Sequence, residues 1–340
     1  MASKFARIAS ALAWRTLNPA ERGPFLETGR PRALQRLYYR AFDGWQAPLL
    51  HLPPLPGAPG EPVLVCHTLL ASNDLYRYGR GPTLVGSLRR AGFSVYLMTH
   101  RGDRDAIAPR WRTGRSFDDI VEFDVPAALQ RVVEHSGYAK VHLVGHGLGG
   151  QIGLAWAARG GDRVAAQVAV AAPVQFDTSM SELRRGALIG AFLPGRVRLP
   201  ARILARLAVP WAEVADDVPG ARWRGALHFG SADCPTELLH QLGTWLREGS
   251  LTDRTGLFDY REGLQAATGP LLVVVSEGDT VCPPWAGRSA AASWGGPADV
   301  LQVERGGHVD LLIGEDASRS VFEPLVAWLD ERRRLAWDGS

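Results

Sequence analysis

The stretch Val144-Gly145-His146-Gly147-Leu148-Gly149-Gly150 decides the fold of this chain. It follows an apolar run, Val141 to Val144, and opens a segment of helical character. It matches the pattern G-x-S-x-G with glycine in place of serine, in the strand-turn-helix context of a nucleophile elbow. Side chains two residues before and after so sharp a turn collide with it, which predicts the glycines at 145 and 149. Gly147, at the apex, has no side chain that could attack a substrate.

Length and composition limit the possible domain organisation, partners and location. With 340 residues, 46% of them hydrophobic, the chain can bury one large core, and we expect one domain with an insertion. The net charge of +3 is small and the arginines form no dense stripe, so we expect no nucleic-acid partner. The three cysteines fit no metal spacing and cannot all pair, which predicts a reducing, cytoplasmic location. No metal or cofactor is expected.

Apolar strands alternate with helical segments along most of the chain. A hairpin is predicted over Leu37–Leu52, with its turn at Asp43-Gly44. One helix should begin at the cap residue Ser116 and end at Gly137. Further strands are expected at 62–66, 93–98, 141–144, 164–170, 271–275 and 300–303, and a helix at 84–91. This order predicts an α/β fold whose doubly wound, mostly parallel sheet is covered on both faces.

The strand pattern stops between residues 173 and 269, where a helical, proline-punctuated segment intervenes. We interpret 173–269 as a helical cap over the ligand crevice, with Trp211, Trp223 and Trp245 mainly in the core of the cap. Residues 37–172 and 270–340 form the core of the fold. Residues 1–36 are predicted to be a helical extension packed on the domain, contact with a membrane surface being the less favoured alternative. No segment is long and apolar enough to span a bilayer.

Two titratable residues follow strands predicted after the glycine-rich turn. Asp279 lies in Gly278-Asp279-Thr280-Val281-Cys282-Pro283, and His308 lies in Gly306-Gly307-His308. An acid that orients a histidine, and a histidine that moves a proton, are the partners that an attacking hydroxyl needs. The order of turn, acid and histidine is the one that this architecture predicts. The arginine-bearing loop from Arg101 to Arg115 is interpreted as solvated, with anion binding as its alternative.

From about Tyr38 to Leu335 the chain resembles the α/β-hydrolase fold family. Two segments, 116–127 and 91–97, are similar to the acid-lipase-like and polyhydroxyalkanoate-synthase-like branches. The resemblance implies that His67-Thr68-Leu69 is the oxyanion loop, usually His-Gly-x in the family, with the backbone N–H groups of Leu69 and Leu148 as donors. It also suggests that His67 and His146 contact the substrate. The implied partner is a small hydrophobic acyl ester, thioester or lactone.

Three hypotheses follow from the missing side chain at Gly147. In the first, which we favour, the chain is an engineered knockout or natural dead relative of an acyl-ester hydrolase, and Gly147→Ser alone restores ester cleavage. In the second, it is a binding module that holds an acyl or other hydrophobic ligand under the cap. In the third, a water in the space left at the apex is activated by His308 and hydrolyses esters slowly. Cys66 is the nearest substitute nucleophile, although a buried structural role is expected for it.

Overall fold

The computed structural model describes residues 34–77, 82–110, 114–177 and 232–333, with short pieces at 179–180, 183–184, 187, 192 and 198–199. The predicted N-terminal helix and the tryptophans at 211 and 223 lie outside the described residues, as does much of the predicted cap. Within the described part of the chain, no helix combines the length and the apolar character needed to cross a membrane.

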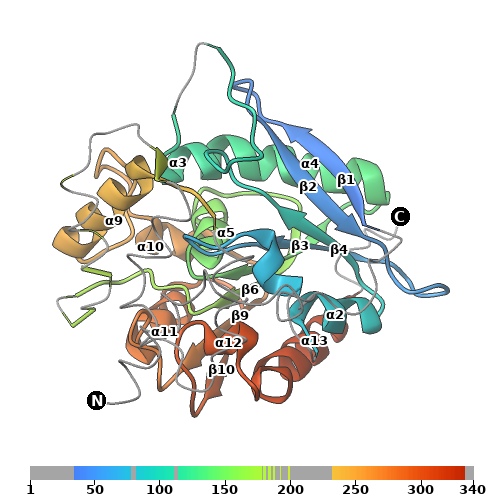
Figure 1. Ribbon diagram of the computed structural model, residues 1–340. Helices are drawn as coiled ribbons and strands as arrows, with labels where there is room; N and C mark the ends of the chain where they lie inside the picture. Colours follow the sequence, from blue (N-terminus) through green and yellow to red (C-terminus); the bar gives the residue numbers. More distant parts are fainter. Residues whose placement is uncertain are drawn as a thin grey trace, which may run out of the picture.

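One eight-stranded sheet forms the centre of the molecule (Figure 1). Its spatial order is β1-β2-β4-β3-β5-β6-β9-β10. The first hairpin pairs antiparallel, β2 is also antiparallel to β4, and all other neighbours are parallel. The mostly parallel sheet predicted from the sequence is therefore confirmed. The strands are β1 (Gln35–Arg40), β2 (Gln46–Leu52), β3 (Pro62–Cys66), β4 (Ser94–Met98), β5 (Val141–His146), β6 (Val164–Val170), β9 (Leu271–Ser276) and β10 (Ala298–Val303).

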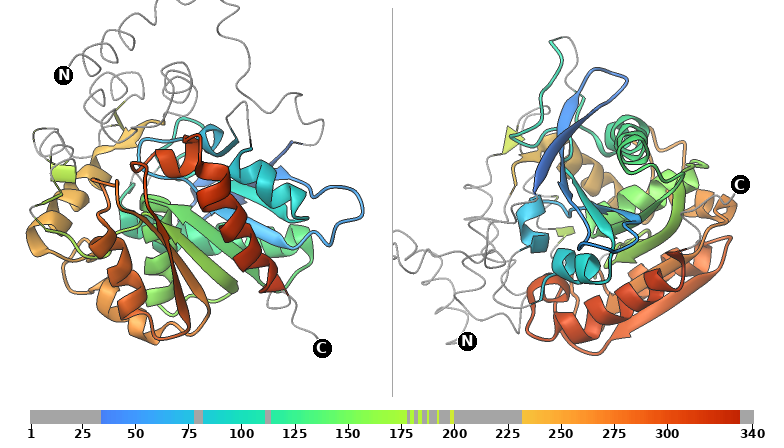
Figure 2. Two further views of the ribbon diagram at one scale, coloured as in Figure 1. Left: turned by 90° about the horizontal axis from the view of Figure 1, so that it is seen from below. Right: turned by 90° about the vertical axis from the view of Figure 1, so that its right-hand side faces the viewer.

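Helices cover both faces of the sheet, as the direction of each crossover requires. Crossovers between parallel strands are right-handed, so the connection from β3 back to β4 carries α2 to the face opposite the forward connections that carry α4, α5 and α11. Helix α13 packs beside α2 (Figure 2). These helices are α2 (Leu84–Arg90), α4 (Val125–Ser136), α5 (Leu148–Ala158), α11 (Pro284–Ser293) and α13 (Glu323–Asp330).

Apart from residues 117–124, the described chain contains several further elements. They are η2 (Asn73–Arg77), α9 (Thr236–Glu248), α10 (Tyr260–Gly263), η5 (Leu264–Ala266), α12 (Asp310–Ile313), η6 (Ser318–Phe322) and the pair β7 (Arg198–Leu199) and β8 (Cys234–Pro235). The core lies along the central strands, because every residue of β3, β4, β5 and β9 is buried. The last strand differs: β10 lies at the edge of the sheet and buries one residue, Val303.

The helix predicted from Ser116 to Gly137 is divided into three parts. Ser116 and Asp119 form a reciprocal capping box for α3 (Phe117–Asp119), and Gly137 ends α4 with a φ of +77°. Between them, η3 (Ile120–Asp124) has π-helical geometry, and the N–H of Val125 donates to the carbonyl five residues earlier. Pro126, the next residue, has no N–H to donate to the preceding turn. The wider turn places Asp124 in the interior, where it is fully buried.

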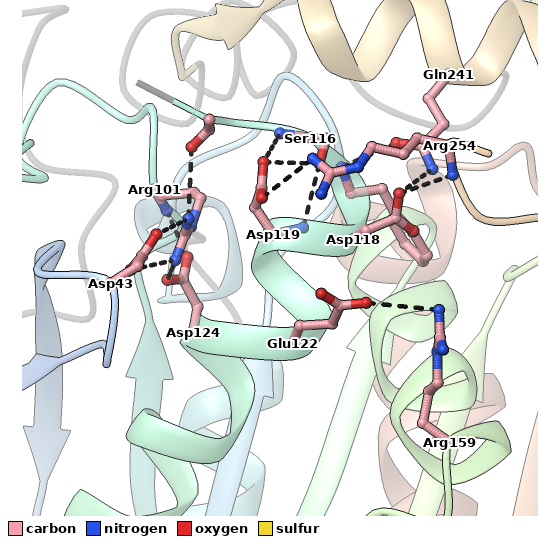
Figure 3. Close-up of polar contacts among 12 residues, drawn as sticks. Asp43, Arg101, Ser116, Asp118, Asp119, Glu122, Asp124, Arg159, Gln241 and Arg254 are labelled. Carbon is pink, nitrogen blue, oxygen red and sulfur yellow. Dashed lines mark hydrogen bonds and ion pairs between the residues drawn. The ribbon is translucent and has the colours of Figure 1, made fainter. Parts of the chain in front are cut away.

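Asp124 is buried because it pairs with an arginine, and this overturns the solvated-loop interpretation for Arg101. The guanidinium of Arg101 lies 2.7 Å from Asp124 and 2.8 Å from Asp43 of the hairpin turn (Figure 3). The Arg101 side chain has no exposed surface. Its backbone N–H also donates to Asp124, at 3.0 Å. This network joins the first hairpin, the loop after β4 and the π-helical turn, so its role is structural.

The adjacent aspartate, Asp118, attaches the segment 236–260 to the core (Figure 3). It accepts hydrogen bonds from the Tyr260 hydroxyl at 2.7 Å, the Arg254 backbone N–H at 2.8 Å and the Gln241 amide at 3.1 Å. Trp245 of α9 is 1% exposed and donates to the Thr252 carbonyl at 2.7 Å. Trp245 is therefore a core residue of this segment, as the sequence predicted.

Truncation of Arg101 should destabilise the fold strongly. Arg101→Ala leaves the Asp124 carboxylate buried and uncompensated, which typically costs about 3–5 kcal/mol of unfolding free energy. Arg104 is a matched control, since its side chain is 81% exposed. Urea denaturation should show a large loss for Arg101→Ala and almost none for Arg104→Ala. Equal losses in the two variants would contradict the structural role of Arg101.

His51 should make the stability of the fold depend on pH. Burial lowers the pKa of His51 from 6.5 to about 4, with the nearby His135 and Arg89 adding to the effect. Between these two values the unfolded chain binds a proton that the folded chain does not, so stability falls as the pH falls. We compare the unfolding free energies of wild type and His51→Gln. As the pH falls through this window, the wild type should lose at most about 1.4 kcal/mol per pH unit relative to the variant. A difference that is independent of pH would refute the assignment.

Candidate active site

The residues that the sequence singled out lie at one edge of the sheet. His67 follows β3, Gly147 follows β5, Asp279 follows β9 and His308 follows β10. These strands are parallel, so their carboxyl ends share an edge, where ligands bind in open α/β sheets. The topology thus brings together residues that are up to 241 positions apart in the sequence.

The turn at Gly147 has the geometry that its glycines predicted. Gly147 has φ +53° and ψ −120°, a region that residues with a side chain rarely occupy. A Cβ at Gly145 would lie 2.3 Å from the backbone carbon of Gly149, and a Cβ at Gly149 would lie 2.1 Å from the Cys66 carbonyl oxygen. The steric reason given for both glycines is therefore confirmed. At Gly149 the backbone at the end of β3 is what leaves no room for a side chain.

Asp279 and His308 form a buried pair that points at this turn. Nδ1 of His308 lies 2.9 Å from Oδ2 of Asp279. The other carboxylate oxygen accepts the N–H groups of Val281 and Cys282, both at 2.8 Å, which fixes the acid in place. Nε2 of His308 faces the turn and would be 3.1 Å from a Cβ at Gly147. An imidazole held in this way can accept a proton at Nε2 while the carboxylate stabilises its charge.

His146 packs against His308 and is almost completely buried. It is 1% exposed, its ring centroid is 4.3 Å from that of His308, and its Nε2 lies 3.0 Å from the His308 carbonyl oxygen. Burial, and secondarily the neighbouring His308, lower the pKa of His146 well below 6.5, so the ring stays neutral and donates to that carbonyl. The sequence suggested a substrate contact, whereas the structure gives His146 a supporting position.

His67, which was also suggested as a substrate contact, is a buried residue. Its ring stacks on His100 with centroids 3.9 Å apart, and its Nδ1 lies 3.0 Å from the Thr68 carbonyl oxygen. Burial lowers the pKa of both histidines, so the stacked rings remain neutral. The pair forms a rigid floor beneath the loop that follows β3.

The loop after β3 contains one of the two backbone positions that were expected to donate to an oxyanion, Leu69, and the other, Leu148, lies at the start of α5. Leu69 lies in a turn that closes with the Ala71 N–H donating to the Thr68 carbonyl at 3.3 Å, and Leu70 in that turn has a φ of +65°. The Thr68 N–H donates to the Tyr76 hydroxyl at 2.8 Å, which holds the loop against η2. Leu148 is the first residue of α5, so its N–H has no acceptor within the helix.

The contact between Thr68 and Gly147 was not found from the sequence. A Cβ built at Gly147 would lie 2.2 Å from the Thr68 hydroxyl oxygen and 3.1 Å from the Thr68 Cβ. The hydroxyl therefore occupies the point where the side chain of residue 147 would begin. The sequence did contain one sign of this contact, because Thr68 stands where His-Gly-x loops usually have glycine. Its proximity to residue 147 depends on the way β3 and β5 pair.

Cys66 has the structural role expected for it. It is fully buried, its sulfur lies 3.8 Å from that of Met98, and burial raises the pKa of its thiol to about 12. A thiol in this state carries almost no thiolate at neutral pH, so Cys66 does not replace the missing nucleophile.

The described structure resembles many solved hydrolases. An esterase from Exiguobacterium antarcticum is 19% identical, with a TM-score of 0.63, over 87% of this chain and 99% of that one. A soluble variant of monoglyceride lipase from Saccharomyces cerevisiae is 15% identical, with a TM-score of 0.62, over 91% of this chain and 99% of the other. A Paleococcus ferrophilus monoacylglycerol lipase is 17% identical, with a TM-score of 0.56, over 88% and 99% of the two chains.

No curated protein matches the chain. At these sequence identities the structural likeness shows only the fold. The assignment to a family comes from a family model. The model for the alpha/beta hydrolase fold matches residues 61–315, a span that contains every residue of the site described above. The chain belongs to the α/β-hydrolase fold family.

Proposed function

We propose that this chain is an acyl-ester hydrolase framework without a nucleophile at residue 147, so that acyl-serine turnover is absent. The Asp279–His308 pair, at 2.9 Å and aimed at the apex, is the observation that carries this proposal. A buried carboxylate that orients an imidazole toward the elbow has its chemical use in proton transfer to and from an attacking group. The proposed substrate class is a small hydrophobic acyl ester, with thioesters and lactones as close chemical relatives.

The surroundings of Gly147 favour a natural replacement over an engineered one. A serine at 147 would place its Cβ 2.2 Å from the Thr68 hydroxyl oxygen and 3.1 Å from the Thr68 Cβ, so the threonine side chain would have to rotate and shift. An enzyme that had recently lost its serine would retain space for that side chain. Thr68 and Gly147 therefore fit each other, and we propose that the chain is adapted to glycine at the apex.

The expectation that Gly147→Ser alone restores activity changes for the same reason. In the single variant the introduced serine and the Thr68 side chain compete for one space, so the new hydroxyl is not aligned with His308. The double variant Gly147→Ser, Thr68→Gly rebuilds the loop usual in the family and opens that space. Loss of an attacking hydroxyl costs about a millionfold in turnover in related triads, so the double variant should be far more active than Thr68→Gly alone.

Hydrolysis of 4-nitrophenyl butyrate tests this proposal. The double variant should cleave the ester by an acyl-serine intermediate, detectable as a mass adduct on the peptide that contains residue 147, and Gly147→Ser alone should be much slower. Addition of His308→Ala to the double variant should abolish the regained turnover. A double variant that is folded, by its circular dichroism, but neither cleaves the ester nor forms the adduct would refute the hydrolase framework.

A further inference from the structure

The Thr68 hydroxyl lies beside the point at which a side chain at the apex would begin. Its oxygen lies 2.2 Å from the point that a Cβ at Gly147 would occupy, and Nε2 of His308 lies 3.1 Å from that same point. A hydroxyl and a proton acceptor thus flank one position at the carboxyl end of β5. A hydroxyl oxygen is therefore present near the apex although residue 147 has no side chain.

Thr68 is held firmly by its backbone. Its N–H donates to Tyr76 at 2.8 Å, and its carbonyl accepts from His67 at 3.0 Å and from Ala71 at 3.3 Å. The residue is 8% exposed. Within the described ranges the hydroxyl has no hydrogen-bond partner, although the backbone N–H and carbonyl of the same residue are both paired. No hydrogen bond joins this hydroxyl to His308 in the described structure, so proton transfer requires the Thr68 side chain to turn toward Nε2 on a backbone that is already held in place.

We infer that Thr68 is the nucleophile of this site and that it acts in place of residue 147. The inference rests on the proposed acyl-ester hydrolase framework and supplies its attacking atom. His308 is the base, because its Nδ1 is bound to Asp279 and its Nε2 faces the apex. Threonine hydroxyls are established nucleophiles where an adjacent base accepts the proton. Leu69 follows Thr68 in the loop and Leu148 follows Gly147 at the start of α5, so their backbone N–H groups are the proposed oxyanion donors.

The reaction balances with groups on this chain and one water. The Thr68 oxygen attacks the ester carbonyl carbon and forms a C–O bond, while its proton passes to Nε2 of His308. The original ester C–O bond then breaks, and the leaving alkoxide takes that proton and departs as the alcohol. Water next gives a proton to His308, attacks the acyl-threonine and releases the acid with the hydroxyl restored.

Two other routes that the sequence left open make different predictions. Direct attack by a water bound to His308 requires neither the Thr68 hydroxyl nor an acyl-enzyme. Attack by Cys66 requires a thiolate, which its raised pKa and its complete burial oppose. Each route predicts a different site of acylation: none, residue 66 or residue 68.

Three variants and one probe distinguish these routes. Thr68→Val removes the hydroxyl at nearly constant volume, Thr68→Ser retains it, and Thr268→Val is a matched change at an exposed threonine. Each folded protein is treated with a short-chain alkyl fluorophosphonate and digested, and the adduct is located by mass spectrometry. Hydrolysis of 4-nitrophenyl butyrate is measured in parallel.

The wild type, Thr68→Ser and Thr268→Val should carry the adduct at residue 68 and hydrolyse the ester. Thr68→Val should lose the adduct, and its turnover should fall by more than about a hundredfold. Unchanged turnover in Thr68→Val, an adduct elsewhere, or a wild type with neither adduct nor turnover would overturn the inference. The Gly147→Ser, Thr68→Gly double variant tests the hydrolase framework separately, because its attacking hydroxyl is at residue 147 and Thr68 is absent.

Discussion

Strand β5 ends in a turn that brings its apex against the loop following β3, and the rest of the site depends on that contact. Gly149 must be a glycine because a Cβ there would meet the Cys66 carbonyl at 2.1 Å. The same close approach leaves room at the apex for one group, either a side chain at 147 or the hydroxyl of Thr68. A glycine at 147 and a threonine at 68 are therefore two parts of one steric arrangement.

The buried polar groups around the apex keep this arrangement rigid. Asp279 accepts hydrogen bonds from two backbone N–H groups and from the His308 ring, and the His308 carbonyl accepts one from the His146 ring. On the far side of β3, His67 and His100 stack as neutral rings under the loop. An unpaired polar group in this interior would cost free energy, so each bond restricts where the imidazole and the loop can lie. The Asp279–His308 contact is thus held in place although residue 147 has no side chain.

Much of the fold and part of the site could be predicted from the sequence. Apolar runs and turn residues predicted the hairpin and the parallel strands, and the spacing of Gly145 and Gly149 predicted the sharp turn between them. Asp279 and His308 could be found from their order along the chain. Long-range packing decided the rest. The burial of Arg101 depends on Asp43 and Asp124, and the packing of His146 behind His308 depends on the sheet order β5-β6-β9-β10, which brings the ends of β5 and β10 to one edge. The contact of Thr68 with the apex requires the register of β3 on β5, which sequence patterns do not contain.

The central claim is that Thr68 and residue 147 compete for one space beside His308. The crystal structure of Gly147→Ala, determined with its melting temperature, tests this claim most directly. We predict that the added methyl group displaces the Thr68 side chain from its position near His308 and lowers the melting temperature, because alanine is also strained at a φ of +53°. A structure in which the new methyl group fits beside an unmoved Thr68, with an unchanged melting temperature, would contradict the claim.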